Sequence, residues 1–289
     1  ILSGLVGSEM CIRDRCGSLC KIKDESFSGF RKELSMALSP LKRLRGTLSG
    51  SVRSGFLMSE MDAMMEFGRM ISLAQVRSYN RTVQMVSRKR EACEKLCGTV
   101  AELDTAIAVL SFRKSLPCCC RPHFIESMKL NVRDIFHPLL RDPVPNSAVF
   151  DKSAVVTGSN ASGKSTFMKA VAVNGILAVS LNTCAARVYQ APKVPVISSM
   201  AVRDSITAGE SYYISEIKSL RRVLERVSRT PCLCFVDEIL KGTNTAERIA
   251  ASAAILQYLC RKNCLCLVAT HDIELTRILG ADFENYHFS

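Results

Sequence analysis

Residues 152–171 read KSAVVTGSNASGKSTFMKAV, and this stretch decides the fold of the chain. A short apolar run at 154–156, predicted as a strand, ends at Gly158, and a helical pattern begins at Lys164. The polar loop between them fits the phosphate-binding pattern G-x-x-x-x-G-K-[ST]. Its backbone N–H groups and the helix N-terminus favour an anion, so we predict a nucleoside triphosphate as the ligand. A glycine turn before an ordinary helix is the alternative.

The residues of this loop have distinct expected roles. We expect Lys164 to reach the β- and γ-phosphates, Ser165 to ligate Mg²⁺ through its hydroxyl, and Thr166 to bond on the α-phosphate side. The rest of the predicted nucleotide-binding loop consists of Gly158, Ser159, Asn160, Ala161, Ser162 and Gly163. The loop therefore predicts ATP together with Mg²⁺.

A second apolar run, at 232–236, ends in two carboxylates, Asp237 and Glu238. A buried strand would deliver Asp237 to its C-terminal edge, where it can hold the Mg²⁺ of the phosphate loop. Glu238 would then orient and polarise the attacking water. By itself, an acidic pair after a strand is equally compatible with a helix N-cap. Together with the loop upstream, the pair favours ATP hydrolysis.

A third apolar run, at 265–269, ends in Thr270 and His271. At this position His271 could donate to the γ-phosphate and report its presence, although a lone histidine is more often structural. The prediction is that three strand tips, with the lysine loop, the two acids and the imidazole, converge on one magnesium-bound triphosphate.

Composition limits the possible classes of protein. The chain has 289 residues, a net charge of +12 and a pI near 9.2, which favour DNA or RNA as a partner. No apolar run approaches the ~20 residues that span a bilayer, so we expect no membrane segment here. We interpret the 14 cysteines as reduced thiols of a cytoplasmic protein. Cys118, Cys119 and Cys120 are adjacent and have no second pair at finger spacing, so we predict no structural zinc.

Three regions are predicted along the chain. Residues 1–15 resemble a segment foreign to the fold, or else an ordinary ragged terminus. Residues 16–115 carry apolar residues at alternating spacings of four and three, which predicts long helices packed as an antiparallel stalk, or two helices of an ordinary bundle. The two series are Leu57, Met61, Met64 and Ile71, with Gly68 in the vacant slot, and Leu96, Val100, Leu103, Ile107 and Leu110 without a gap. Residues 116–289 follow, and their first part, to about 150, is rich in proline and marks a junction.

From residue 150 onward, strand-like and helical patterns alternate. Strands are predicted at 153–157, 194–203, 232–236 and 264–269, and helices at 164–181, 210–229, 245–260 and 272–279. This alternation indicates an α/β domain with a mostly parallel sheet. The cysteines at 232, 234, 264 and 266 alternate along two strands, and we interpret them as small core residues.

The motifs together resemble the ATPase domain of the MutS family of DNA mismatch-repair proteins, an ABC-type P-loop NTPase. The likeness rests on residues 157–166, on Asp237-Glu238 continuing as ILKGTNT to Thr245, and on Ala269-Thr270-His271. It covers 116–289 firmly and the helices before them loosely, as part of the family's lever region. Ser159 departs from the proline usual in mismatch-recognising members, and no mismatch-reading domain is visible. The chain is thus expected to be a fragment of a MutS-like protein.

The resemblance implies further properties. Family members form dimers through the ATPase domain, and a signature loop of one subunit reaches the γ-phosphate in the other; here Ser211 would make that contact in trans. Val144 and Pro145 lie where the adenine is usually packed. A DNA-dependent ATPase that clamps DNA, weak or inactive as an isolated fragment, is the implied function. The alternatives are an ABC- or SMC-like DNA-associated ATPase and a catalytically inactive nucleotide-binding scaffold.

Overall fold

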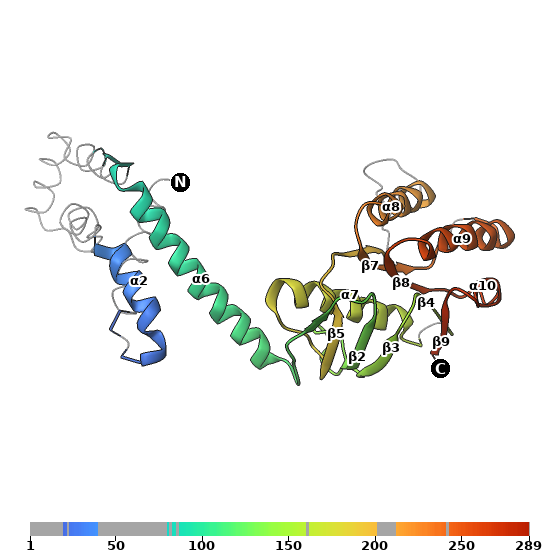
Figure 1. The fold of residues 1–289 in the computed structure, drawn as a ribbon, viewed down its shortest axis with the longest axis horizontal. Coiled ribbons are helices and arrows are strands. Elements are labelled where there is room, and N and C mark those ends of the chain that lie inside the picture. Colours follow the sequence, from blue (N-terminus) through green and yellow to red (C-terminus); the bar gives the residue numbers. More distant parts are fainter. Residues whose placement is uncertain are drawn as a thin grey trace, which may run out of the picture. The chain divides into compact units, whose positions relative to one another are not determined.

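The structure, a computed structural model, describes residues 20–21, 23–39, 80, 83–84, 87–159, 162–200, 212–240 and 243–288. The chain divides into two compact units, Ile1–Leu110 and Ser111–Ser289. The helices described are η1 (Glu25–Phe27), α2 (Ser28–Leu38), α6 (Arg90–Ser115), α7 (Lys164–Leu181), α8 (Tyr212–Val227), α9 (Thr245–Cys260) and α10 (Glu274–Ile278) (Figure 1). Among the described residues, no helix combines the length and the apolar character that crossing a membrane requires.

The first unit contains α2 and most of α6. Leu34 and Ala37 of α2 are buried against Leu96 of α6, and this small cluster is the core of the described part of the unit. The apolar series of α6 continues to Ile107 and Leu110, whose side chains are about half exposed. The series predicted at 57–71 lies outside the described residues. Within the described residues of the region 16–115, for which long helices were predicted, α6 is a helix of 26 residues.

The second unit is built on a five-stranded sheet with the order β6-β7-β8-β4-β9. Its strands are β6 (Val196–Ser199), β7 (Cys232–Asp237), β8 (Cys264–Ala269), β4 (Ala154–Gly158) and β9 (Glu284–Phe288). Every pairing in it is parallel. The predicted α/β domain with a mostly parallel sheet is therefore confirmed. Helix α10 is shorter than the stretch 272–279 predicted for it, and β9 was not predicted.

A second sheet, which was also not predicted, takes three strands from the proline-rich junction and a fourth from the segment after α7. It has the order β1-β5-β2-β3, with strands β1 (His123–Ile125), β5 (Val188–Pro192), β2 (Leu130–Ile135) and β3 (Asn146–Phe150). The pairings of β2 with β3 and with β5 are antiparallel, and that of β1 with β5 is parallel. Proline ends helices here, as expected, but it does not prevent short strands whose ends fall next to it.

Alternating side chains of the parallel sheet enter two separate cores. Ala154 and Val156 of β4 face α7, which lies between the two sheets, and they share a core with Phe150 of the second sheet. Val155 points to the opposite face, which α8, α9 and α10 cover (Figure 1). Cys232, Cys234 and Cys266 are fully buried on that face, which confirms that they are core residues, whereas Cys264 is only partly buried and packs against the same core. The strands are thus covered on both faces, so functional residues are expected at the ends of the strands.

Candidate functional site

The strand order brings the three predicted motifs to one edge of the sheet. β8 lies between β7 and β4, with Asp237 of β7 in register with Ala269 of β8. Ala269 is in turn in register with Val156 of β4, two residues before the loop begins at Gly158. Because the strands are parallel, their C-terminal ends meet, and polar groups that follow them converge there.

The phosphate loop has the backbone that its glycines predict. Gly158 and Gly163 have φ angles of +151° and +97°, in the region that favours glycine. A Cβ atom added to Gly158 would collide with the carbonyl oxygen of Phe288 in β9. Glycine at 158 thus lets β9 pair closely beside the loop. Asn160 and Ala161, predicted members of the loop, lie outside the described residues.

Lys164 begins α7, and its side chain is almost completely buried. Its Nζ donates to the carbonyl oxygens of Gly158 and Ser159, each at 2.7 Å. A buried ammonium requires such partners, because an unpaired charge is costly away from water. The ammonium is therefore held within the loop itself, where an anionic ligand would also be bound.

Two side-chain contacts join the predicted motifs. Ser165 Oγ donates to Asp237 Oδ1 at 3.0 Å, which links the loop helix to β7. His271 Nε2 lies 3.1 Å from Glu238 Oε1, which links β8 to β7. The backbone supports the second contact, since the Glu238 N–H donates to the Ala269 carbonyl at 2.9 Å. Glu238 has a φ of +55°, a left-handed conformation that costs a non-glycine residue roughly 1–2 kcal/mol.

Other predicted site residues occupy varied positions. Ser162 Oγ is buried and has no hydrogen-bond partner among the described residues, so it is available to a ligand. Thr166 is exposed in the first turn of α7. Val144 and Pro145 are exposed directly before β3. Ser211, predicted to act in trans, lies outside the described residues.

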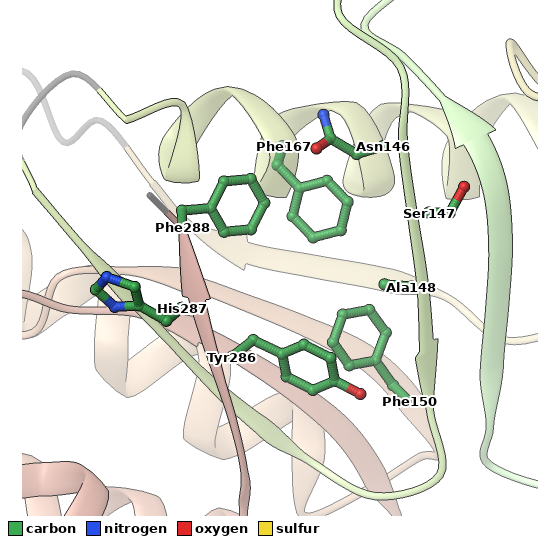
Figure 2. Close-up of a pocket in the computed structure, with 8 residues that line it drawn as sticks. All are labelled: Asn146, Ser147, Ala148, Phe150, Phe167, Tyr286, His287 and Phe288. Carbon is green, nitrogen blue, oxygen red and sulfur yellow. The ribbon is translucent and has the colours of Figure 1, made fainter.

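Sequence reasoning missed an aromatic cavity next to the loop. It has a volume of about 310 Å³ and lies where β3, α7 and β9 approach one another (Figure 2). The ring centroids of Phe150 and Tyr286 are 4.8 Å apart, and those of Phe167 and Phe288 are 5.2 Å apart. The lining is completed by Asn146, Ser147, Ala148 and His287. An aromatic wall with a few polar groups suits a flat ring such as a nucleobase.

A neighbouring cavity lies beside the polar site and shares two lining residues with the aromatic cavity. It has a volume of about 380 Å³, and its lining includes Gly158 and Ser159 of the loop, His271 after β8, and Tyr286 and His287 of β9. The last two residues also line the aromatic cavity. The two cavities therefore adjoin along β9, with the aromatic wall in one and the loop and the imidazole lining the other. In the sequence, β9 is marked only by the alternating polar and aromatic residues ENYHF at 284–288. This run is too short to predict a strand that pairs with β4.

Tyr286 offers a test of this wall. Its hydroxyl donates to the Val149 carbonyl and lies 3.0 Å from Glu284 Oε2. Burial, followed by the bond to Glu284, raises the pKa of Tyr286 to about 12. The folded state therefore favours the neutral phenol. The resulting stabilisation of the folded state is fully present below the ordinary pKa near 10 and is lost as the pH rises through 12. We expect Tyr286→Phe to cost about 1 kcal/mol at neutral pH and to flatten the fall in Tm above pH 10, followed by circular dichroism.

Tyr258→Phe is the control for that measurement, because the bond to Ser228 lowers the pKa of Tyr258 instead. Removal of the Tyr258 hydroxyl should leave the fall in Tm above pH 10 at least as steep as in the wild type. Equal pH profiles for wild type and Tyr286→Phe would contradict the assigned hydrogen bonds.

The parallel sheet, the loop after β4 and the carboxylates after β7 define a P-loop nucleoside triphosphatase fold. Residues 154–289 match the family model described as MutS domain V. These residues therefore form domain V of a MutS family protein, and the family assignment of the chain rests on them.

Three of the relatives that the chain matches carry the MutS name. It is 29% identical to the DNA mismatch repair protein MutS of Leptospira interrogans, over 92% of this chain and 34% of that protein. It is 28% identical to MutS of Pseudothermotoga lettingae, over 66% of this chain and 26% of that protein. It is 30% identical to human MutS protein homolog 4, over 67% of this chain and 22% of that protein. The chain spans about a third of the length of the first of these relatives.

Proposed function

We propose that this chain binds and hydrolyses Mg-ATP as the ATPase part of a MutS-like DNA-repair protein. The observation that carries the proposal is the meeting of two contacts at one sheet edge, Ser165 with Asp237 and Glu238 with His271. A helix N-cap would explain an acidic pair, but it would not explain why each acid contacts a different predicted motif. An ATP site explains both.

The residues present fit Mg²⁺ and a triphosphate. Mg²⁺ in such sites takes one or two protein oxygens and fills its other positions with water and phosphate oxygens. Ser165 Oγ and Asp237 Oδ1 are two such oxygens in direct contact. The Ser162 hydroxyl, which has no partner within the part of the loop that the structure describes, is a further donor for phosphate.

Each side chain has a role in hydrolysis under this proposal. Lys164 binds the β- and γ-phosphate oxygens in place of the loop carbonyls that now accept its bonds. Bound Mg²⁺ supplies positive charge to the phosphate oxygens. Glu238 orients the attacking water and accepts its proton at the carboxylate, while His271 holds that carboxylate through Oε1. The adenine ring of ATP would occupy the aromatic cavity, with Val144 and Pro145 as neighbours at the start of β3.

The whole protein would couple this site to DNA. As the family resemblance implies, two copies would associate through the ATPase units, with Ser211 of one copy reaching the nucleotide of the other. The helices of residues 16–115, including α6, would act as levers that clamp DNA, and the net charge of +12 is consistent with a polyanionic partner. The cysteines of the described residues are free thiols, as in a reducing compartment such as the cytoplasm.

Calorimetric titration with ATP tests the binding site. We expect the wild type to bind ATP more tightly with Mg²⁺ than with EDTA. Ser165→Ala should weaken Mg-ATP binding about tenfold, the equivalent of one lost polar contact, and should reduce the difference that EDTA makes. Turnover measured with and without DNA tests the coupling.

Ser180→Ala is a matched control near the other end of α7, where Ser180 Oγ donates only to the Ile176 carbonyl. It should leave ATP affinity unchanged. A wild type that binds no ATP, or binds it equally with EDTA, would overturn the proposed function. Tight binding without turnover in a dimer would favour the inactive scaffold.

A further inference from the structure

A paired arginine and aspartate lie beside the proposed water-activating residues. Arg248 Nε donates to Asp272 Oδ2 at 2.9 Å and Arg248 Nη2 to Asp272 Oδ1 at 2.6 Å. Their side chains are only 24% and 13% exposed. A two-bond fork fixes the relative orientation of its partners as well as their distance, unlike a single exposed ion pair. The pair is therefore a rigid link between two elements.

Both partners are fixed within their own elements. Arg248 lies in the first turn of α9, where its N–H donates to the carbonyl of the N-cap residue Asn244. Asp272 directly follows His271, and its N–H donates to the hydroxyl of the buried Thr270 at 3.0 Å. The link thus joins the start of α9 to the turn that carries the imidazole.

Arg248 and Asp272 join the two segments that also carry Glu238 and His271. Along the chain, a short segment leads from Glu238 to α9 and so to Arg248, while Asp272 is the neighbour of His271. Across space, His271 and Glu238 are 3.1 Å apart. Without the ion pair, α9 and the turn after β8 would lose the fork that fixes their distance. Asp272 would then also remain as a poorly hydrated carboxylate that has lost the two bonds from Arg248.

We propose that Arg248 and Asp272 are positioning residues for ATP hydrolysis, which hold Glu238 and His271 in the geometry that orients the attacking water. The charges around the arginine agree with this role. Glu238 and Glu274 act on Arg248 together with Asp272, so the guanidinium balances a small cluster of carboxylates. This inference rests on the proposed ATPase function and adds residues to it that no phosphate-loop motif contains.

Arg248→Gln tests the role. Misplacing a water-orienting carboxylate by a fraction of its contact distance is expected to lower kcat by about ten- to a hundredfold. The affinity for Mg-ATP should stay within about twofold, because the loop, Lys164 and Ser165 are untouched. Arg248→Lys keeps the charge but cannot form the two-bond fork, so its kcat should lie between that of the wild type and that of Arg248→Gln. The reversed pair, Arg248→Asp with Asp272→Arg, should recover part of the lost turnover. The measurements are single-turnover hydrolysis and titration with an ATP analogue that is not hydrolysed.

Arg221→Gln is the matched control, since Arg221 makes a single exposed contact of 2.8 Å with Glu225 on α8. Its turnover should equal that of the wild type. Wild-type kcat in Arg248→Gln, or an equal loss in affinity and turnover, would overturn the positioning role. A wild type without ATP binding would instead overturn the proposed function.

A thermal measurement decides the inference even where turnover is slow. If the ion pair holds the contact between Glu238 and His271, the Tm losses of Arg248→Gln and His271→Ala should not add in the double variant. The double variant should lose clearly less than the sum of the single losses. Strict additivity would show that the ion pair and the imidazole are independent, and would overturn the inference.

Discussion

Replacement of Lys164 by alanine is expected to abolish ATP turnover, with a loss of at least about a hundredfold in kcat/KM. The Lys164 ammonium is the one positive side chain that the described loop holds, and it is buried between the carbonyl groups of Gly158 and Ser159. A triphosphate brought to this loop would lose its main neutralising charge in a site of low dielectric. Hydrolysis of ATP measured by phosphate release, together with calorimetric binding, checks the result.

The Lys164→Ala variant is also expected to remain folded. Removing a buried charge together with its side chain relieves the cost of keeping that charge from water, and the two loop carbonyls lie near the protein surface, where water can replace their donor. Lys152→Ala is the control, because Lys152 precedes the opposite end of β4 and donates only to the Ala281 carbonyl at 3.4 Å. Wild-type turnover in a folded Lys164→Ala protein would exclude this loop as the site of hydrolysis.

The sequence predicted those parts of the fold that depend on local patterns. The start of α7 at Lys164 follows from the loop glycines and the helical period, and the structure places the helix at the predicted residues 164–181. Strands β7 and β8 are continuous apolar runs bounded by polar residues, which is the pattern of strands buried on both faces. Their polar tips meet because parallel strands share one C-terminal edge.

The parts that were missed depend on pairings between distant residues. Strand β9 pairs with β4 across about 130 positions of sequence, for example Val156 with Tyr286. The aromatic cavity combines Phe150, Phe167 and Phe288 from three elements, and no local period signals that these rings face one another. The same holds for Arg248 and Asp272. Each looks like an ordinary charged residue near the start of a helix until the fold brings them together.

Glu238→Gln is expected to separate binding from chemistry, with hydrolysis slowed by about 10²- to 10³-fold and Mg-ATP binding retained. Glutamine has the same shape as glutamate and can still accept a bond from His271 at its oxygen, so the contact of 3.1 Å and the left-handed backbone of residue 238 should persist. An amide cannot accept the proton of the attacking water. Single-turnover hydrolysis, with binding followed by calorimetry, should therefore show a trapped ATP complex.

Glu225→Gln provides the comparison, because Glu225 belongs to an exposed ion pair on α8. This variant should hydrolyse ATP at the wild-type rate. The contrast between Glu238 and Asp237 then becomes informative. Asp237 contacts Ser165 and is proposed to hold the metal, so its loss should weaken Mg-ATP binding, whereas Glu238 should affect the rate alone. A Glu238→Gln protein that hydrolyses ATP at the wild-type rate would show that another group activates the water, and the left-handed backbone at Glu238 would then require a different explanation.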